Sequence, residues 1–443
     1  MCKKNFKIIY LLTYRIELID LVKSLYSLLI KDNILILPIF TDYPADHQQK
    51  IELENVFIKE GIEFKNLDNY YFKTAIQFLG DEKPDFVITD NDLLNITHIF
   101  ILSSKRMNIP VLLIRESVTY VNGNQSARVT VGSQNFSAII NNFISKLDKM
   151  PKYIKMFSFF LRSISLIEPT LILNTKELMQ SFMFGFSGYI YGSYSDYILS
   201  NTSKDAEILR EKCPRVKKIF VVGNPRYDNI KSAILDKSLI ETTKQKVCSL
   251  NHIPLNKKIV LFLSSSHLEH QMVSESTKLK MNKQLLEIFY SFNEKIFFII
   301  KLHPIEKNIF PKIWKNEYNK SISVIDINLD DAILISDLVV TWPSTAMLNV
   351  VITNKPLIMI DFMNFHKVHG LIQTDDILKL GASLEANSGE SLKLYINSFL
   401  NDDKIWNTLF KNQLAFKNEY LNYNGKSLEL IKNHIITLLK KTT

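Results

Sequence analysis

Short apolar runs alternate along the chain with longer segments whose apolar residues recur at helical spacing. Four runs lie in the first half, at residues 7–12, 34–39, 86–89 and 111–114. The second half adds runs at residues 197–199, 217–223, 257–263, 296–301, 321–327, 338–341 and 355–362. Runs of this length suit strands that are buried on both faces, so the alternation predicts an α/β protein built on parallel sheets.

Residues 83–92 and 108–117 show the pattern most clearly. Each begins with a proline-containing turn, continues as an apolar run and ends in polar residues, and residues 93–107 between them have helical spacing. A strand, a helix and a second parallel strand form a crossover that is right-handed in nearly all proteins. Both strands are therefore expected to end at the same edge of one sheet, where ligands bind in open parallel sheets.

The two sets of strands predict two Rossmann-like domains that face each other across a cleft, followed by a C-terminal helical tail. A length of 443 residues suits two or three domains. We place the first domain at residues 1–195 and the second at residues 196–400. The tail, residues 401–443, could pack back on the first domain.

Residues 141–185 differ in character from the rest of the first domain and predict a helical insertion. The clearest helix follows Pro151 and spans residues 152–167, where three cations edge a wide aromatic face. Such a face suits a helix that lies in a membrane interface. A helix packed in a groove between domains, or at a dimer contact, would show the same pattern and is slightly favoured.

The formal net charge of +9 suits an anionic partner such as a nucleotide, a phosphorylated polymer or an acidic membrane surface. A modest excess of solvated lysines would give the same charge. No zinc-finger spacing, RNA-binding signature or arginine-rich tract occurs, so nucleic acid is not an expected partner. The chain has three scattered cysteines, and its first segment resembles a strand more than a secretion signal, so we expect it in a reducing cytoplasm. No window of the sequence is apolar enough to span a membrane.

The apolar run at residues 296–301 ends in side chains poorly suited to a core. Lys301 and His303 would lie at the carboxyl end of a strand, and Pro304 prevents its continuation and fixes the turn. An imidazole held there can donate a hydrogen bond to a phosphate oxygen, and Glu306 can accept one from a ribose hydroxyl or orient His303. A lone histidine is more often structural, but this combination favours a phosphate site.

A second polar cluster follows the run at residues 338–341. Pro343 turns the chain, Ser344 is expected to cap the next helix, and Thr345 to lie in its first turn, where free N–H groups favour an anion. An N-cap that touches no ligand fits the same residues. Because both clusters follow neighbouring strands, we expect His303, Ser344 and Thr345 to converge on one diphosphate.

Two further turns supply small polar or basic groups. The turn after residue 263 contains Ser264, Ser265, Ser266, His267 and His270. Small side chains at a strand end allow close approach to a leaving phosphate, although a flexible polar turn has the same composition. The turn at residues 221–228 is expected mainly to join the domains, with Arg226 as a secondary phosphate contact.

A carboxylate of the first domain is expected to take the proton from an acceptor hydroxyl, a role that contributes about 10²–10⁴ in rate. Glu116 is the first candidate and Asp90 the second. Asp92 and Arg115 stand beside them. Each of these residues could instead cap a helix or pair with a neighbouring charge.

Several common sites are absent from the sequence. There is no Gly-x-Gly-x-x-Gly, Walker loop, Cys/His metal spacing or Gly-x-Ser-x-Gly elbow, so neither a bound cofactor nor a metal is expected. With 12 glycines in all, the chain does not depend on a glycine-rich phosphate loop.

The order Gly-Asn-Pro-Arg-Tyr-Asp, Lys-x-His-Pro-x-Glu and ISDLVVTWPSTAMLN resembles bacterial surface-polysaccharide transferases of GT-B architecture over about residues 190–365. The similar groups are capsule glycosyltransferases with a His-Pro motif, including sialyl- and Kdo-transferase types, and CDP-glycerol glycerophosphotransferases. The first half is similar to a generic acceptor domain and to UDP-GlcNAc 2-epimerases.

The resemblance implies metal-independent, inverting transfer from a nucleotide-activated sugar to a surface glycan or glycolipid, at the inner face of the membrane. It also implies that His303, Ser344 and Thr345 contact the donor phosphate. Two departures stand out. The glycerophosphotransferases often have Thr-Asp-Tyr-Ser-Ser followed by Asp, where this chain has Thr-Trp-Pro-Ser-Thr and Asn349, and no Glu-rich ribose motif follows Ser344.

Sugar transfer is the first expectation. The alternatives are polyol-phosphate transfer from CDP-glycerol, a hydrolysing nucleotide-sugar 2-epimerase, and a non-catalytic GT-B scaffold at a membrane. The sequence does not indicate an oligomeric state.

Overall fold

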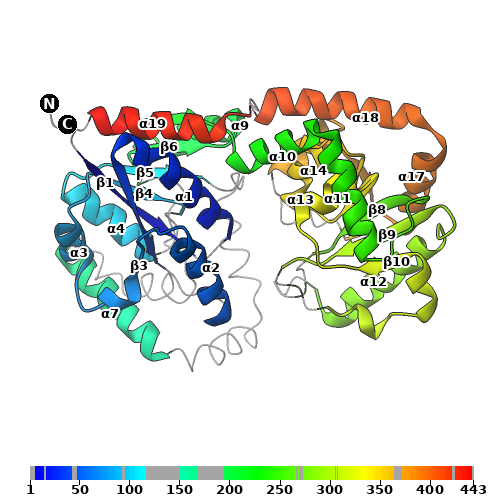
Figure 1. Cartoon of the computed structure of the whole chain (residues 1–443), viewed down its shortest axis with the longest axis horizontal. Coiled ribbons are helices and arrows are strands. Elements are labelled where there is room, and N and C mark those ends of the chain that lie inside the picture. Colours follow the sequence, from blue (N-terminus) through cyan, green and yellow to red (C-terminus); the bar gives the residue numbers. More distant parts are fainter. Residues whose placement is uncertain are drawn as a thin grey trace. The chain divides into compact units, whose positions relative to one another are not determined.

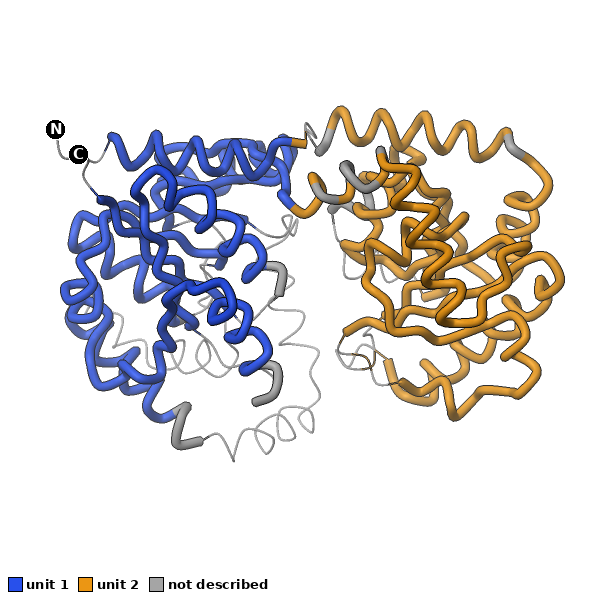
Figure 2. Tube along the Cα trace, in the orientation of Figure 1, with its two compact units in different colours: residues 1–225, 426–443 blue, residues 226–425 orange. Residues whose placement is uncertain are grey.

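The structure is a computed structural model that describes residues 5–13, 16–41, 47–91, 95–115, 150–167, 194–265, 268, 273–304, 306, 308–363, 372–421 and 425–441. The chain forms two compact units, shown in Figure 2. The first unit is Met1–Pro225 with Lys426–Thr443, and the second is Arg226–Gly425. Figure 1 labels many of the elements of each. Among the described residues, no helix is long and apolar enough to cross a membrane.

The first unit is built on a seven-stranded sheet in which every described pair of neighbours is parallel. Its order is β3-β2-β1-β4-β5-β6-β7. The strands are β1 (Phe6–Leu12), β2 (Ile34–Phe40), β3 (Lys65–Asn66), β4 (Phe86–Thr89), β5 (Val111–Ile114), β6 (Tyr197–Ser200) and β7 (Lys218–Val221). The four strands predicted in the first half of the sequence are thus confirmed to within a residue at each end.

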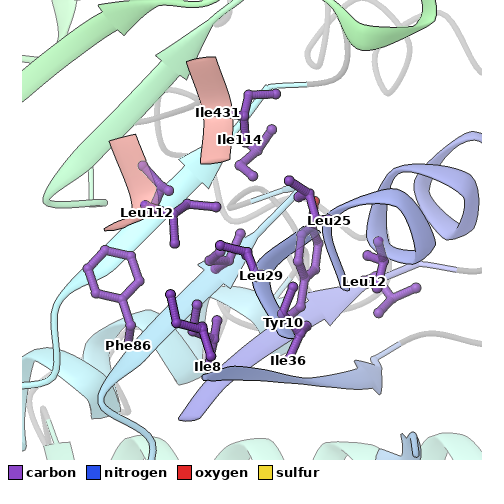
Figure 3. Close-up of a cluster of buried hydrophobic side chains, with 14 of the residues drawn as sticks. Ile8, Tyr10, Leu12, Leu25, Leu29, Ile36, Phe86, Leu112, Ile114 and Ile431 are labelled. Atoms are coloured by element: carbon purple, nitrogen blue, oxygen red, sulfur yellow. The ribbon is translucent and has the colours of Figure 1, made fainter. Parts of the chain in front are cut away.

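Helices cover both faces of this sheet. They are α1 (Ile16–Leu29), α2 (His47–Lys59), α3 (Ala75–Glu82), α4 (Asn95–Arg106), α7 (Met150–Ile167), α9 (Ser203–Lys212) and α19 (Ser427–Lys441), with 3₁₀ turns at Ile30–Asp32 and Leu67–Tyr70. Because successive side chains of a strand point to opposite faces, β1 contributes Ile8, Tyr10 and Leu12 to one core. That core includes α1, α2 and α19, and Figure 3 shows part of it.

Helix α7 belongs to the opposite layer of the first unit. Its residues Phe159, Phe160 and Ile164 are buried in a core shared with α3 and α4. Ser163 is buried, and its hydroxyl accepts a hydrogen bond from the backbone N–H of Ala75 at 2.9 Å. The aromatic face read from residues 152–167 therefore packs within its own unit. The rest of the predicted insertion, residues 141–149 and 168–185, lies outside the described residues.

The second unit contains a six-stranded parallel sheet of order β10-β9-β8-β11-β12-β13. Its strands are β8 (Lys258–Leu263), β9 (Ile296–Lys301), β10 (Ile322–Val324), β11 (Leu338–Thr341), β12 (Leu357–Ile360) and β13 (Leu384–Ala386). Counted from β8, the order is that of a Rossmann fold, and the first six strands of the other sheet follow it too. The predicted α/β class with two Rossmann-like domains is confirmed.

The helices of the second unit also form two layers. They are α10 (Pro225–Leu235), α11 (Lys237–Leu250), α12 (Glu275–Tyr290), α13 (Leu329–Ile335), α14 (Ala346–Ile352), α16 (Ile372–Lys379), α17 (Gly389–Asn401) and α18 (Asp403–Phe416), with short 3₁₀ turns at Phe310–Lys312 and Asn316–Lys320 and a π-helical turn at Lys417–Leu421. Residues of α12, α17 and α18 share one core with β8, β9 and β11. Helix α13 contacts α11, α14 and strand β8, and α14 contacts β12.

The break between the units differs from the one expected at residues 195 and 196. Strand β6 pairs with β5 and β7 pairs with β6, so both complete the first sheet, and the break falls after Pro225. The tail is divided as well. Helix α18 stays in the second unit, whereas α19 places Ile431 and Ile435 in the core of the first.

Three aspartates fix the register of these sheets at their amino ends. Asp85, Asp196 and Asp337 each stand directly before a strand, at the start of β4, β6 and β11. The Asp337 carboxylate accepts from the backbone N–H of Ile259 at 2.7 Å, while its own N–H donates to the Ile259 carbonyl at 2.7 Å. Asp85 makes the same reciprocal pair with Lys7, and Asp196 with Val111. Each pair locks two neighbouring parallel strands.

We expect Asp337→Ala to lower the stability of the second unit by about 1–3 kcal/mol, because the N–H of Ile259 loses its acceptor. Asp337→Asn keeps an oxygen at that position and should cost less. The chain's three tryptophans, Trp314, Trp342 and Trp406, all lie in the second unit. Their fluorescence during urea unfolding therefore reports on the second unit. Equal urea midpoints for wild type and Asp337→Ala would contradict the stabilising role of the pairing between Asp337 and Ile259.

Candidate active site

Three neighbouring strand ends of the second sheet meet at one edge. In the parallel register, Leu263 of β8 lies beside both Lys301 of β9 and Thr341 of β11. The strand order reverses between β8 and β11, which is where ligands bind in open parallel sheets. From the sequence, the turns after β9 and β11 were expected to be direct neighbours. The structure places β8 between them, so its serine turn is central to the edge.

The turn after β9 presents His303 to solvent. His303 and Pro304 are both exposed. The N–H of His303 lies 3.0 Å from the Ser264 hydroxyl oxygen and 3.3 Å from Oε2 of Glu306. The N–H of Glu306 donates to the His303 carbonyl at 2.9 Å and closes the turn. The backbone of His303 is therefore held on both sides, whereas its residue surface remains accessible.

Glu306 is too buried for the ribose contact that was one of its two expected roles. It is only 8% exposed. Its Oε1 lies 2.5 Å from the ammonium of Lys278, and its Oε2 accepts from the Ser264 hydroxyl. A carboxylate this buried needs a charged partner, and Lys278 provides it. Of the two roles expected for Glu306, the geometry favours orienting the His303 turn.

Lys301 is half-buried at the end of β9. Burial lowers the pKa of its ammonium below the usual 10.5, and the carboxylate of Asp326 opposes that shift in part. A bound anion would add to the effect of Asp326, because a negative charge nearby favours the protonated amine.

The turn after β11 begins its helix one residue later than predicted. Thr345, not Ser344, occupies the N-cap of α14, and its side chain makes no capping hydrogen bond. The carbonyl of Ser344 accepts from Met347 N–H at 3.2 Å. Thr345 is exposed and Ser344 half-buried, so neither hydroxyl is enclosed in the core.

Asn349 and Arg226 share one acidic partner. The Asn349 amide donates to Oδ1 of Asp330 at 2.9 Å, and a guanidinium nitrogen of Arg226 lies 3.6 Å from the same oxygen. Helix α13 thus places a carboxylate next to Asn349, the residue that stands where the similar family often has an Asp. Part of the charge of Arg226 is compensated by Asp330, which weakens its predicted role as a phosphate contact.

The first unit has its own pair at the equivalent edge. Asp90 follows β4 and is 4% exposed, and its Oδ2 accepts from the hydroxyl of Thr13, which follows the neighbouring strand β1. Arg115 is buried in a 3.0 Å ion pair with Asp205, so its role is structural. The remaining candidate residues, Glu116, Asp92, Ser266, His267 and His270, lie outside the described residues.

Sequence reasoning missed Lys278 and Asp330. Lys278 lies in the second turn of α12, among other lysines with the same local pattern, and only its burial distinguishes it. Asp330 stands in the first turn of α13, where acidic residues are common for reasons of helix stability. Among the described residues, no group of three or more His, Cys, Asp or Glu side chains is arranged to hold a metal ion.

The described site, from β8 to the turn after β11, falls within a stretch that matches a known family. Residues 191–408 match the family of CDP-glycerol:poly(glycerophosphate) glycerophosphotransferases. The glycerophosphotransferase match spans all six strands of the second sheet and two strands of the first. No curated protein matches the chain by sequence.

Solved structures share the fold of the whole chain. A variant of the wall teichoic acid polymerase TagF soaked with CDPG is 13% identical, with 99% of this chain and 90% of that chain covered and a TM-score of 0.51. MnaA of S. aureus with UDP is 14% identical, with coverages of 98% and 97% and a TM-score of 0.54. UDP-GlcNAc 2-epimerase from Neisseria meningitidis bound to UDP-GlcNAc is 15% identical, with coverages of 98% and 100% and a TM-score of 0.55. The expected GT-B fold class is confirmed.

We predict that Lys301 titrates below 10.5 in the ligand-free protein, because its half-buried ammonium is partly desolvated. After reductive methylation with ¹³C-formaldehyde, the chemical shift of the dimethylated amine reports its titration. The signal missing from Lys301→Arg identifies the resonance. A midpoint at or above 10.5 would contradict the described environment.

Proposed function

We propose that the chain is a GT-B transferase that moves a group from a nucleotide-activated donor to a cell-surface polymer, and that the second unit binds the donor. The observation that carries the proposal is that Lys301 and His303 lie at the end of β9 and Ser344 follows β11, the two strands that flank β8 beside the point where the strand order reverses. The family match over residues 191–408 covers these strand ends.

Between the two kinds of transfer, the match with glycerophosphotransferases favours polyol-phosphate transfer from CDP-glycerol. In that reaction the acceptor hydroxyl oxygen bonds to the phosphorus of the glycerol phosphate, and the bond from that phosphorus to the nucleotide phosphate breaks. Sugar transfer, the first expectation from sequence, is the second candidate. There the new bond forms at the anomeric carbon, and a nucleotide leaves with its phosphate.

Both reactions leave negative charge on a nucleotide phosphate. We assign its stabilisation to Lys301 and His303, with the hydroxyls of Ser344 and Thr345 as further donors, since preorganised donors at a developing charge contribute strongly to rate. We assign the proton of the acceptor hydroxyl to a carboxylate of the first unit, Asp90 or Glu116. In this proposal the reaction needs no metal or bound cofactor, and a sugar donor would react with inversion.

The donor is tested by thermal stabilisation with CDP-glycerol, UDP-GlcNAc, a CMP-sugar and a GDP-sugar. A true donor at about 100 times its Kd should add about 2.7 kcal/mol to the stability of the folded protein. We expect the largest shift with CDP-glycerol and loss of that shift in Lys301→Ala. Lys295→Ala is a matched control, because Lys295 is an exposed lysine at the opposite end of the same strand.

His303→Ala should lower kcat by about 10²–10³, the usual effect of losing one donor to a developing oxyanion. Because His303 is exposed, the variant should unfold at the temperature of the wild type. Transfer that continues at the wild-type rate would overturn the proposal. Absence of transfer by the wild type with every donor tested would instead leave the non-catalytic GT-B scaffold as the alternative.

We further propose that the enzyme works at the inner membrane face, with a glycan or glycolipid polymer as acceptor, and that α7 contributes to this association. On its outer side Ile154 is 62% and Leu166 is 50% exposed, and the helix carries Lys155 and Arg162 but no acidic residue. Exposed apolar and cationic side chains together suit an anionic lipid surface.

Ile154→Ser combined with Leu166→Ser should weaken co-sedimentation with vesicles that contain phosphatidylglycerol, because both side chains would insert at the lipid boundary. Leu250→Ser is the matched control, since Leu250 is 70% exposed on the second unit. Equal sedimentation of the double variant and the wild type, or equal binding to neutral vesicles, would contradict the role of α7.

A further inference from the structure

A buried lysine joins the two strand-end turns of the candidate site. Lys278 lies in α12 and is 5% exposed. Its ammonium donates to the backbone carbonyl of Ser265, in the turn after β8. The same ammonium lies 2.5 Å from Oε1 of Glu306, in the turn after β9. One side chain from a helix therefore holds both turns at once.

Glu306 completes the connection from the other side. Its Oε2 accepts from the hydroxyl of Ser264 and lies 3.3 Å from the N–H of His303. The Ser264 hydroxyl is itself 3.0 Å from that N–H. We call Lys278, Glu306 and Ser264 the clamp. It ends on the backbone of His303, an exposed residue of the turn.

A buried ion pair is a poor way to stabilise a fold. Removing two charges from water costs several kcal/mol for each ion, and apolar residues of similar volume often replace such a pair with no loss of stability. Hydrogen bonds to charged groups, however, are short and directional. The clamp is thus better suited to fixing the position of the His303 turn than to holding the second unit together.

We propose that Lys278 and Glu306 are positioning residues for donor transfer, which set the His303 turn against the end of β8. The inference rests on the proposed function, and it assigns no contact between Lys278 and the donor. Small displacements of reacting groups are costly, since a shift of about 1 Å can lower the rate about 100-fold.

The test compares Lys278→Met with Lys278→Met/Glu306→Met. The single variant leaves a buried carboxylate without its counter-ion and should unfold at a lower temperature. The double variant removes both charges and should recover most of that loss. Lys283→Met is the matched control, because Lys283 lies on the same helix and is exposed; it should behave as the wild type.

Two readouts separate positioning from simple stability. In the double variant we expect kcat to remain about 100-fold below wild type although the fold has recovered. Recovery of kcat together with stability would overturn the proposal. Amide hydrogen exchange provides the second readout, since the N–H groups of His303 and Glu306 should exchange faster in the double variant than in Lys283→Met.

The exchange measurement needs no substrate, so it distinguishes two kinds of failure. Unchanged exchange at residues 301–306 would mean that the clamp does not hold the turn, and the inference would fail alone. Faster exchange in a protein that neither binds a nucleotide donor nor transfers its group would mean that the clamp is real and the proposed function wrong.

Discussion

The reciprocal pairing of Asp337 with Ile259 fixes the register of β8 against β11, and with it the level at which both strands end. A strand that is apolar on both faces carries little information about register in its pattern, because a shift by one residue still buries apolar side chains. A carboxylate directly before the strand removes that freedom, since Asp337 pairs with both the N–H and the carbonyl of Ile259, and a shift by one residue would break both bonds. The same device recurs at Asp85 and Asp196 in the other sheet.

Once the register is fixed, neighbouring parallel strands end at the same level, and the polar residues that follow them lie at one edge of the sheet. These residues differ in how deeply they are buried. Glu306 and Lys278 compensate each other inside the protein, and His303 and Thr345 remain at the surface. Buried charges hold the geometry, and donors at the surface avoid the cost of being desolvated during folding. This division of roles follows from solvation alone, whichever substrate the site binds.

The strands and the α/β class were predictable because they depend on local patterns, and the apolar runs at residues 86–89 and 111–114 became β4 and β5 with no change of bounds. The assignment of strands to sheets was not predictable in the same way. Strand β6 contains Tyr-Ile-Leu-Ser, which suits either sheet, and only its pairing with β5 places the break after Pro225.

The candidate site shows the same limit. Lys301, His303 and the hydroxyls of the turn at residues 341–345 could be found because they interrupt apolar runs. Whether a polar side chain after a strand points inward or outward depends on the conformation of the turn, which the sequence pattern does not show. The burial of Glu306 could therefore not be predicted, and a contact with a ribose remained possible. Lys278 gave no signal, because one buried lysine among the exposed ones of α12 differs from them only through contacts with residues far along the chain.

The two sheets share a topology over six strands, yet the polar side chains at their carboxyl edges differ in burial. In the first unit, Asp90 accepts from Thr13 and Arg115 pairs with Asp205, and all four side chains are buried. In the second unit, the corresponding edge presents an exposed imidazole and an exposed hydroxyl above a buried ion pair. Exposed donors suit the repeated binding and release of an anionic donor. A carboxylate that takes a proton must come within hydrogen-bond reach of the acceptor hydroxyl, and Asp90 is only 4% exposed. The accessible groups of the second edge are therefore the ones that an anion could reach directly, whereas the polar groups of the first edge hold one another in place.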